Sequence, residues 1–426
     1  MIVSAFVLAA VVGTAPVTAH RPVSTSSPVA QARFDTALTE LYAYAGGDAA
    51  IEFDAAALSD PHLAIAFWGK ALAEGSDINT PLTEERFDRA AQAARAAVAL
   101  KTYASPEERA LIEAVAMRYT GSFTDRVRDE SAYEDAMRAY VASHPSDDDA
   151  ATLLVEASLE RGGMHWNEDG TPLGASSAAM LASDSAVLAR SPQHLLANHL
   201  CIHLYDNAPD RSPAVACAQR LDTMTFAPED EHLAHMPAHT WIERGNGASA
   251  DASSERAWQL HPQRYAEHDA YVGLLGAIYS GNTARISVWS NRYRPFGDPA
   301  AVLIAKGRPD TVAMAAAQRD EAAGKIDAAA ANLRAAMSYQ RSHFEGEIQP
   351  ADPADNRLGA LFYRAGRFSD AQAAFLDVLS RRPDDPRGLF GMSETLRRLG
   401  RADEAEAYAT RARAGWAGLA LTMTAF

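Results

Sequence analysis

The sequence predicts an all-α protein, an α-solenoid of stacked helix hairpins that diverges in its N-terminal and central parts and is regular at its C-terminus. Three observations support this fold class. Alanine dominates a composition that is 48% hydrophobic, and the alternation of Val, Ile and Thr that marks strands is almost missing. Prolines recur at nearly constant intervals in the middle of the chain. Two segments near the C-terminus repeat each other after 34 residues.

Residues 1–19 have the features of a signal peptide. Ala5–Gly13 is an apolar stretch too short to span a bilayer, and the small residues Val17 and Ala19 after it fit a signal-peptidase site. A later cleavage after residue 32 and a disordered apolar tail are the alternatives. No later segment is apolar enough to cross a membrane, so we expect a mature chain without a membrane span, periplasmic or secreted.

The rest of the chain divides by composition. Residues 20–32 are rich in Pro, Ser and Thr, which predicts a flexible segment. A divergent helical array with a histidine-rich groove is expected over residues 33–292. Residues 293–310 are rich in Pro and Gly, which indicates a linker, and residues 311–426 should form the regular C-terminal repeats.

The helix pairs of the central part are marked by prolines. Pro145, Pro192, Pro228 and Pro262 each separate one helical stretch from the next, and the last three are 36 and 34 residues apart. Proline lacks the N–H group that a helix interior needs, so it falls at helix boundaries. The expected pairs are Gln193–Asn207 with Pro213–Met224, Glu229–Arg244 with Ala248–Leu260, and Arg264–Ser280 with Thr283–Asn291.

The C-terminal repeats have a regular period. Gly366 and Gly400 are 34 residues apart, and so are Ala371 and Ala405. Glycine ends the first helix of each pair, and small alanine lets the two helices approach closely. Ala322–Met337 looks like a further copy. This pattern resembles the tetratricopeptide repeat (TPR), whose fold is a solenoid of helix hairpins.

Histidines are crowded into one part of the chain, because eight of the 13 fall within residues 194–268. In two successive repeats they occupy equivalent positions. His199 and His203 lie seven and eleven residues after one proline of the series, and His235 and His239 lie seven and eleven residues after the next. Chance clustering would not keep the repeat register, so we predict that these histidines form a functional site.

Residues three, four and seven positions apart share one face of a helix. This spacing adds His232 to the second histidine pair and Asp206 to the first, and neighbouring first helices carry His268 and Glu156. In TPR arrays the first helices line the concave surface, so the resemblance implies that these side chains look into one groove. The expected metal ligands are His199, His203, His235 and His239, with His232 and His268 as further ligands.

Neutral imidazole is a common ligand of transition metals, so we expect a transition-metal ion, with Zn or Cu as the first candidates. In a hydrolytic metalloenzyme Glu156 would take the proton of a metal-activated water, and Asp206 is the second candidate catalytic residue. Copper would instead support redox chemistry. The alternative function is a metal-free scaffold of the cell envelope that binds peptides or assembles partners in the groove.

Two other segments are candidates for covering the groove. Residues 162–174 form a long loop between two helices, in which His165, Trp166 and Asp169 would close over the histidines. A plain surface insertion is the alternative. Earlier in the chain, the segment with Trp68 and Asn79 would supply a wall, although a core position is the more ordinary role for Trp68.

The segments "ANHLCIH" and "HLAHMPAH" also resemble those of a group of exported bacterial repeat proteins with paired ANHxxxH and HxxHMPxH motifs. The acidic residue that follows the second histidine in that group is usually Glu, whereas this chain has Asp206. It also has Lys70 in "AFWGKA", where Glu is common. The resemblance implies the fold and the site but no particular reaction.

The only two cysteines are Cys201 and Cys217. Cys201 lies between two of the candidate histidines and faces the opposite side of that helix, toward the second helix of its own pair. Cys217 lies on that second helix. We therefore expect a disulfide in an oxidising compartment; two buried free thiols are the alternative.

The composition also bears on partners. A net charge of −16 without a run of Lys or Arg argues against nucleic acid, whose phosphates would be repelled. We expect a small molecule or a peptide in the concave groove, and the C-terminal repeats offer a surface for a protein partner. A nucleophile elbow, a phosphate-binding Gly loop and a dinucleotide fingerprint are all missing from the sequence.

Overall fold

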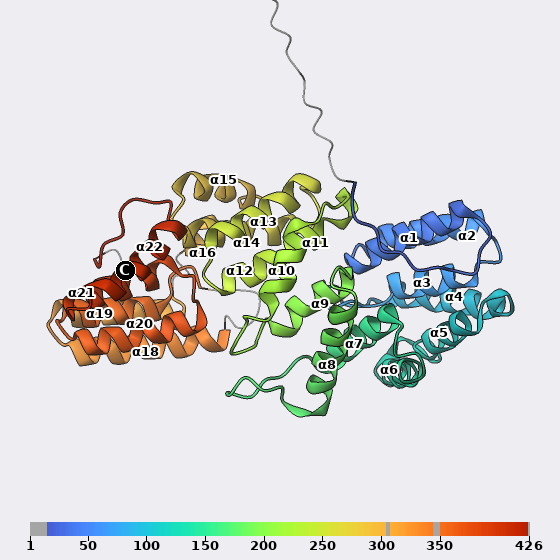
Figure 1. Ribbon diagram of the computed structural model, residues 1–426, viewed down its shortest axis with the longest axis horizontal. Coiled ribbons are helices and arrows are strands. Elements are labelled where there is room, and N and C mark those ends of the chain that lie inside the picture. Colours follow the sequence, from blue (N-terminus) through green and yellow to red (C-terminus); the bar gives the residue numbers. More distant parts are fainter. Residues whose placement is uncertain (1–14, 304–306, 344–349, 425–426) are drawn as a thin grey trace, which may run out of the picture.

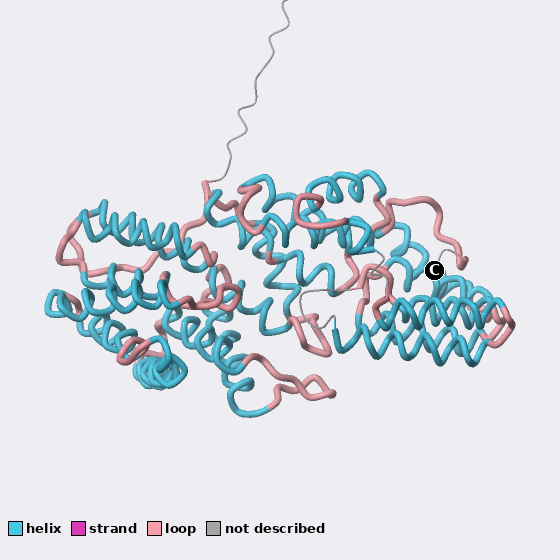
Figure 2. Tube along the Cα trace, turned by 180° about the vertical axis from the view of Figure 1, so that it is seen from behind, coloured by secondary structure: helices cyan, strands magenta, loops and turns pink. Residues whose placement is uncertain are grey.

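The computed structural model describes residues 15–303, 307–343 and 350–424. Over this range the chain is an elongated row of antiparallel helix pairs, with the N-terminal helices at one end and the C-terminal helices at the other (Figure 1). Helices and loops make up almost all of the path (Figure 2), and the extended pairing among the described residues is one antiparallel bridge between Trp166 and Pro172. The predicted all-α solenoid of TPR-like hairpins is confirmed.

Eight helices form the N-terminal part, and several begin at side-chain caps. Ser27 accepts a hydrogen bond from the N–H of Ala30, and Ser105 and Glu108 form a capping box. The helices are α1 (Pro28–Tyr42), α2 (Gly46–Ser59), α3 (Ala64–Ala73), α4 (Glu84–Leu100), α5 (Pro106–Met117), α6 (Arg126–Ser143), α7 (Asp148–Gly162) and α8 (Gly174–Arg190).

The segment before α1 differs from the flexible stretch that we expected over residues 20–32. Helix α1 already begins at Pro28, and the residues before it are hydrogen-bonded to the array. The Arg21 guanidinium donates to Asp147 and Asp149, at 2.8 and 2.9 Å, and the N–H of Ser24 donates to Glu108 at 2.7 Å. The sequence pattern could not reveal these distant partners. Most of the predicted signal peptide, residues 1–14, lies outside the described residues.

The central helices follow the predicted pairs closely. They are α9 (Leu195–Tyr205), α10 (Ala214–Thr223), α11 (Glu231–His235), α12 (Pro237–Glu243), α13 (Gly247–Leu260), α14 (Ala266–Tyr279) and α15 (Thr283–Tyr293). One prediction was wrong in detail, because Glu229–Arg244 was expected to be one helix. It is interrupted at Met236, since Pro237 has no N–H to donate to the preceding turn.

The C-terminal part contains α16 (Pro299–Leu303), α17 (Pro309–Ala322), α18 (Ile326–His343), α19 (Ala354–Arg364), α20 (Phe368–Arg381), α21 (Pro386–Arg398) and α22 (Ala402–Gly415). Gly366 and Gly400, the predicted turn glycines, have φ of 74° and 79°. Ala371 and Ala405 are fully buried at the helix crossings. Helix α16 lies inside the segment for which we expected a linker.

Most of the N-terminal and central helices share one large hydrophobic core, with smaller clusters between α14 and α15 and around Val187, and the C-terminal repeats have their own core. Backbone hydrogen bonds join the two parts. The N–H of Asp384 donates to the carbonyl of Arg244 at 2.9 Å, and the N–H of Ala417 donates to that of Ser280 at 2.8 Å. Among the described residues, none of the helices has the length and apolar character needed to cross a bilayer.

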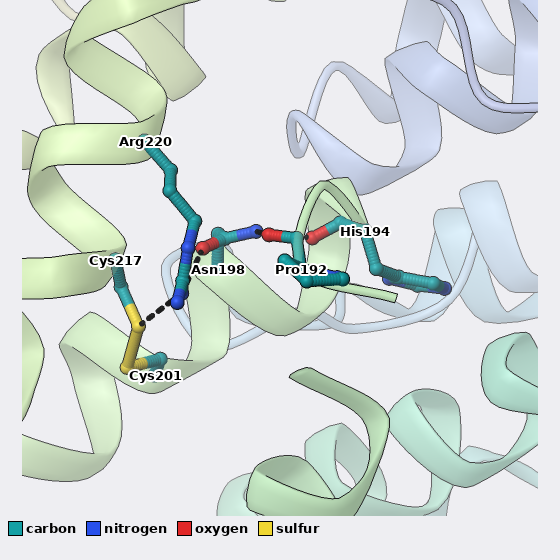
Figure 3. The surroundings of a disulfide bond; sticks show 6 residues. All are labelled: Pro192, His194, Asn198, Cys201, Cys217 and Arg220. Atoms are coloured by element: carbon teal, nitrogen blue, oxygen red, sulfur yellow. Dashed lines mark hydrogen bonds between the residues drawn. A yellow bond between two sulfur atoms is a disulfide. The ribbon is translucent and has the colours of Figure 1, made fainter. Parts of the chain in front are cut away.

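The helix that carries the first histidine pair is tied to its partner by the predicted disulfide (Figure 3). Cys201 on α9 and Cys217 on α10 are bonded, with their Cα atoms 6.4 Å apart, inside the range that a disulfide requires. Arg220 donates to the side-chain oxygen of Asn198 at 3.2 Å, and the Asn198 amide donates to the carbonyls of Pro192 and His194. The disulfide and the hydrogen bond between Arg220 and Asn198 therefore join the two helices at neighbouring turns.

Candidate metal centre

The six histidines predicted as ligands form two neighbouring groups of three. The ligand atoms within each group lie within 4.8 Å of one another. The first triad is His199, His203 and His232, and the second triad is His235, His239 and His268. The first helices α9, α12 and α14 are in contact in this order, which brings the two groups side by side.

This arrangement differs from the single site that we expected between His199, His203, His235 and His239. Instead, a third histidine from the next element completes each pair. His232 completes the first triad, and His268 completes the second. His232 and His235 lie on the same short helix, with ring centroids 6.2 Å apart, and they turn toward different neighbours. The repeat register placed the residues correctly but could not tell which rings would meet.

The tautomers of the first triad are fixed by their hydrogen-bond partners. His199 Nδ1 lies 2.9 Å from the carbonyl of Tyr42, and His203 Nδ1 lies 3.1 Å from Asp206 Oδ2. A carbonyl and a carboxylate only accept, so both Nδ1 atoms carry the hydrogen. The two Nε2 atoms then face each other at 3.2 Å. Such a contact is repulsive unless a proton or a cation lies at it.

The third ring of this triad, His232, is held on three sides. Tyr265 stacks on it with ring centroids 4.7 Å apart, and Tyr44 lies 5.8 Å away on a nearly parallel plane. The Asn79 amide is 3.1 Å from His232 Nε2. Tyr44 and Tyr265 are the two non-glycine residues of the described chain with positive φ, at 55° and 46°. Backbone strain of this kind is found mainly at functional sites.

The second triad is centred on His239. Its Nε2 atom lies 3.0 Å from His235 Nε2 and 3.3 Å from His268 Nε2. Asp269 Oδ1 lies 2.8 Å from His235 Nδ1, and this carboxylate is fully buried. In many metal sites, a carboxylate contacts the ring nitrogen of a histidine that does not coordinate the metal, and this contact orients the imidazole. Both triads therefore have a carboxylate beside one ring, and the contact of Asp269 with His235 is close without having the geometry of a hydrogen bond.

Burial keeps four of the six rings neutral. Removal from water, with a smaller contribution from neighbouring histidines, lowers the pKa of His199, His232 and His239 well below the usual value. The same cause lowers the pKa of His268 to about 3. Neutral imidazoles can donate their lone pairs to a metal ion at neutral pH.

Apart from His203, which lines the edge of a cleft, the six histidines are covered by other parts of the chain. Five of the six are at most 7% exposed, and His268 is partly buried. The N-terminal hairpin covers them, because α1 packs against α9 and Tyr44, just after α1, lies 4.4 Å from the His199 ring. The expected groove for a peptide is therefore filled at this point by the chain itself.

The two candidate catalytic acids have different surroundings. Asp206 contacts His203 directly and orients it. Glu156 lies beyond Tyr44, in a small enclosed cavity that it shares with Asp77 and Glu160. Burial and these neighbouring carboxylates raise the pKa of Glu156 well above its usual value. Glu156 is not a member of either triad.

An open cleft of about 870 Å³ leads to the first triad. Its lining includes His203, Asp206 and the predicted covering loop, from which Trp166 and Leu173 face the cleft. Trp166 Nε1 donates to the carbonyl of Leu204 at 3.2 Å, so the loop is anchored to the end of α9. Asp169 instead caps its own turn by accepting hydrogen bonds from Thr171. Trp68 is fully buried core.

Sequence reasoning missed four residues of this centre: Tyr42, Tyr44, Tyr265 and Asp269. The tyrosines on either side of α1's C-terminus have no periodicity that would connect them to histidines 150 residues away. Tyr265 and Asp269 flank His268 in "YAEHD", which is a weak signal. Only the packing of α1 and α14 against α9 and α12 gives them a role.

Comparisons with known proteins identify no family for this chain. No known protein family and no curated sequence matches it. Its helices are similar to those of a monomeric IFIT1 mutant with Gppp-AAAA, at 14% identity over 90% of this chain and 71% of that one, with a TM-score of 0.28. The TPR domain of P58(IPK) is also 14% identical, over 90% of this chain and 92% of that domain, with a TM-score of 0.24. At such TM-scores the backbones do not superpose, so the repeat architecture rests on this chain's own helix pairs.

Proposed function

We propose that this protein is an exported helical-repeat protein that binds two transition-metal ions, one in each histidine triad. His199, His203 and His232 would hold the first ion and His235, His239 and His268 the second. Three imidazoles leave at least one coordination position for a water or a substrate, as in zinc sites with catalytic activity. A metalloenzyme is therefore the class of function that this site would serve.

The observation that carries the proposal is the contact between His199 Nε2 and His203 Nε2. The contacts with Tyr42 and Asp206 orient the two rings so that their Nε2 atoms lie 3.2 Å apart in a buried place. Burial opposes a proton there, because it lowers the pKa of His199. A metal ion is the cation that imidazole lone pairs favour. Zn and Cu are the first candidates.

The disulfide supports export, since disulfides persist in oxidising compartments such as the periplasm. A periplasmic or secreted location also fits the predicted signal peptide. The burial of the histidines under the N-terminal hairpin favours a metal site over the metal-free peptide scaffold, because a peptide would have to displace that hairpin.

Metal content tests the proposal. The protein purified from cells grown with Zn and Cu should contain about two metal ions per chain by elemental analysis. His203→Ala and His235→Ala should each lower the content to about one. His343→Ala, which changes an exposed histidine on α18, should leave it unchanged. Metal-free wild-type protein, or equal metal content in all variants, would overturn the proposal.

A further inference from the structure

The chain that follows α22 folds back onto the C-terminal repeats. We call residues 416–424 the tail. Its first part touches the central array, where the N–H of Ala417 donates to the carbonyl of Ser280 at 2.8 Å. Its far part reaches α19, where Arg364 Nη1 donates to the carbonyl of Met423 at 2.6 Å. The tail therefore leads from the central array into a groove between helices of the C-terminal repeats.

The groove holds one side chain of the tail. Met423 is 8% exposed and belongs to the hydrophobic core of the C-terminal repeats. A cleft of about 240 Å³ lies beside this position, and Thr424 forms part of its edge. We call this cleft, together with the position of Met423, the C-terminal groove. It is lined by Met314, Ala317, Glu321, Leu333, Leu361 and Arg364. The apolar place where Met423 is buried is therefore continuous with the surface of the protein.

The rest of the tail is less buried. The side chains of residues 417–422 are exposed or only partly buried, and Leu419 is 90% exposed. The hydroxyl groups of Thr422 and Thr424 lie 3.0 Å from each other, so they form a hydrogen bond within the tail itself. Met423 therefore provides the main attachment of the tail to the C-terminal groove, through its apolar side chain and its backbone carbonyl.

Both contacts are of a kind that binds extended peptides in general. A main-chain carbonyl can accept a hydrogen bond whatever the neighbouring side chains are, and an apolar pocket for one side chain adds specificity. Methionine is flexible and unbranched, so it fills irregular apolar sites well. The charge of Arg364 is already paired with Glu321, at 2.7 Å. The groove therefore favours an uncharged segment over an acidic one.

We infer that the C-terminal groove binds an extended segment of a partner protein, with an uncharged sequence around one methionine, and that the tail is its internal competitor. In the free chain Met423 occupies the groove, because its tether keeps it close to the site. A partner segment takes its place and releases the tail. This inference is independent of the metal proposal, since the six histidines lie on α9, α11, α12 and α14, whereas the groove lies on α17, α18 and α19.

Binding of a labelled peptide to the full chain tests the inference. The peptide has the sequence of residues 417–424 and carries a fluorescent label. Met423→Asp in the protein should release the tail, because a carboxylate is not stable in an apolar site. This variant should bind the peptide at least about ten-fold more tightly than the wild type, whose tethered tail competes at a roughly millimolar effective concentration. Leu419→Asp, the same change at an exposed position of the tail, should bind the peptide as weakly as the wild type.

Two further changes locate the bound peptide. Placed in the peptide itself, Met423→Asp should abolish binding. In the protein with the released tail, Arg364→Ala should weaken binding, whereas Arg319→Ala, which removes an exposed arginine from α17, should not. Equal peptide affinity in the wild type and the Met423→Asp protein, or peptide binding that needs neither Met423 nor Arg364, would overturn the inference.

Light scattering distinguishes a partner segment from the tail of a second copy. A wild-type dimer that Met423→Asp converts to a monomer would show that a second copy fills the groove, and it would overturn the partner assignment. If Met423→Asp does not fold, a chain shortened after Ala420 removes the same contact and keeps the hydrogen bond from Trp416 to the carbonyl of Leu419. The shortened chain should show the same gain in peptide affinity over the wild type, and no gain would overturn the inference.

Discussion

At the residue scale, the proposed metal centre depends on groups that orient several of its imidazoles. A carbonyl and a carboxylate determine the tautomers of His199 and His203, and Asp269 stands behind His235. Such partners raise the affinity of a site because the ligands need no reorientation on binding. The aromatic rings of Tyr44 and Tyr265 add a packing restraint on His232.

Asp206→Ala should weaken metal binding at the first triad by about 10- to 100-fold, the usual effect of losing a carboxylate that orients a histidine. Competition with a chelator of known affinity would measure it. Asp210→Ala, which removes an exposed carboxylate from the following turn, is the control and should leave both affinities unchanged. An equal loss of affinity in both variants would contradict the role of Asp206.

Asp184→Asn should stabilise the protein in a pH-dependent way. Asp184 is buried on α8, and burial raises its pKa from the ordinary 3.8 to about 8. The unfolded chain releases this proton near pH 4 and the folded chain keeps it to about pH 8, so the free energy of unfolding falls as the pH rises between these values. Asparagine does not titrate. The advantage of the variant in urea denaturation should grow from pH 5 to pH 8, and a constant difference would disprove the shift.

At the scale of elements, the first helices of successive pairs carry the histidines. The connections around these helices determine the directions in which the histidine side chains point. The break at Met236 divides the second histidine helix into α11 and α12. His232 and His235 on α11 can then serve different triads, while His239 on α12 joins the second. On α9 the histidines and Cys201 occupy opposite faces, so the disulfide stiffens the helix without entering the site.

Replacing Cys201 and Cys217 by Ser should lower the free energy of unfolding by about 3 kcal/mol, the chain-entropy value for a loop of roughly this length. Guanidinium denaturation with and without a reductant would measure the change. The reductant should destabilise the wild type and have no effect on the double variant. Two thiols reacting in the unfolded, unreduced wild type would show that the bond is not formed.

At the scale of the whole molecule, the C-terminal repeats dock on the central array at the turn after α12, the helix that carries His239. Gly245, at the turn after α12, has φ of 79°, and a Cβ there would lie 2.7 Å from the backbone of Asp385. The Arg244 side chain pairs with Asp384 at 3.1 Å beside it. The junction is therefore a tight backbone contact flanked by an ion pair.

Gly245→Ala should open this junction and make the chain more sensitive to limited proteolysis between the two parts. Gly366→Ala is a matched control, because Gly366 has a similar φ of 74° but a Cβ there would meet no atom within 4 Å. Both variants carry the strain of a left-handed alanine, so a difference between them isolates the docking contact. Identical proteolysis patterns would contradict this account.

The sequence by itself determined the helix pairs, their turns and the six histidines, because these depend on local period and on Pro and Gly at fixed offsets. It also placed Cys201 opposite the histidine face, which predicted the disulfide. The tertiary structure alone decided that the histidines form two triads, that Tyr42, Tyr44 and Tyr265 surround them, and that residues 20–27 pack on the array. These contacts join residues of different helix pairs, which lie 33 positions apart for His232 and Tyr265 and 157 for Tyr42 and His199. A local pattern fixes which side of a helix a residue occupies but not which ring of another helix pair it meets there.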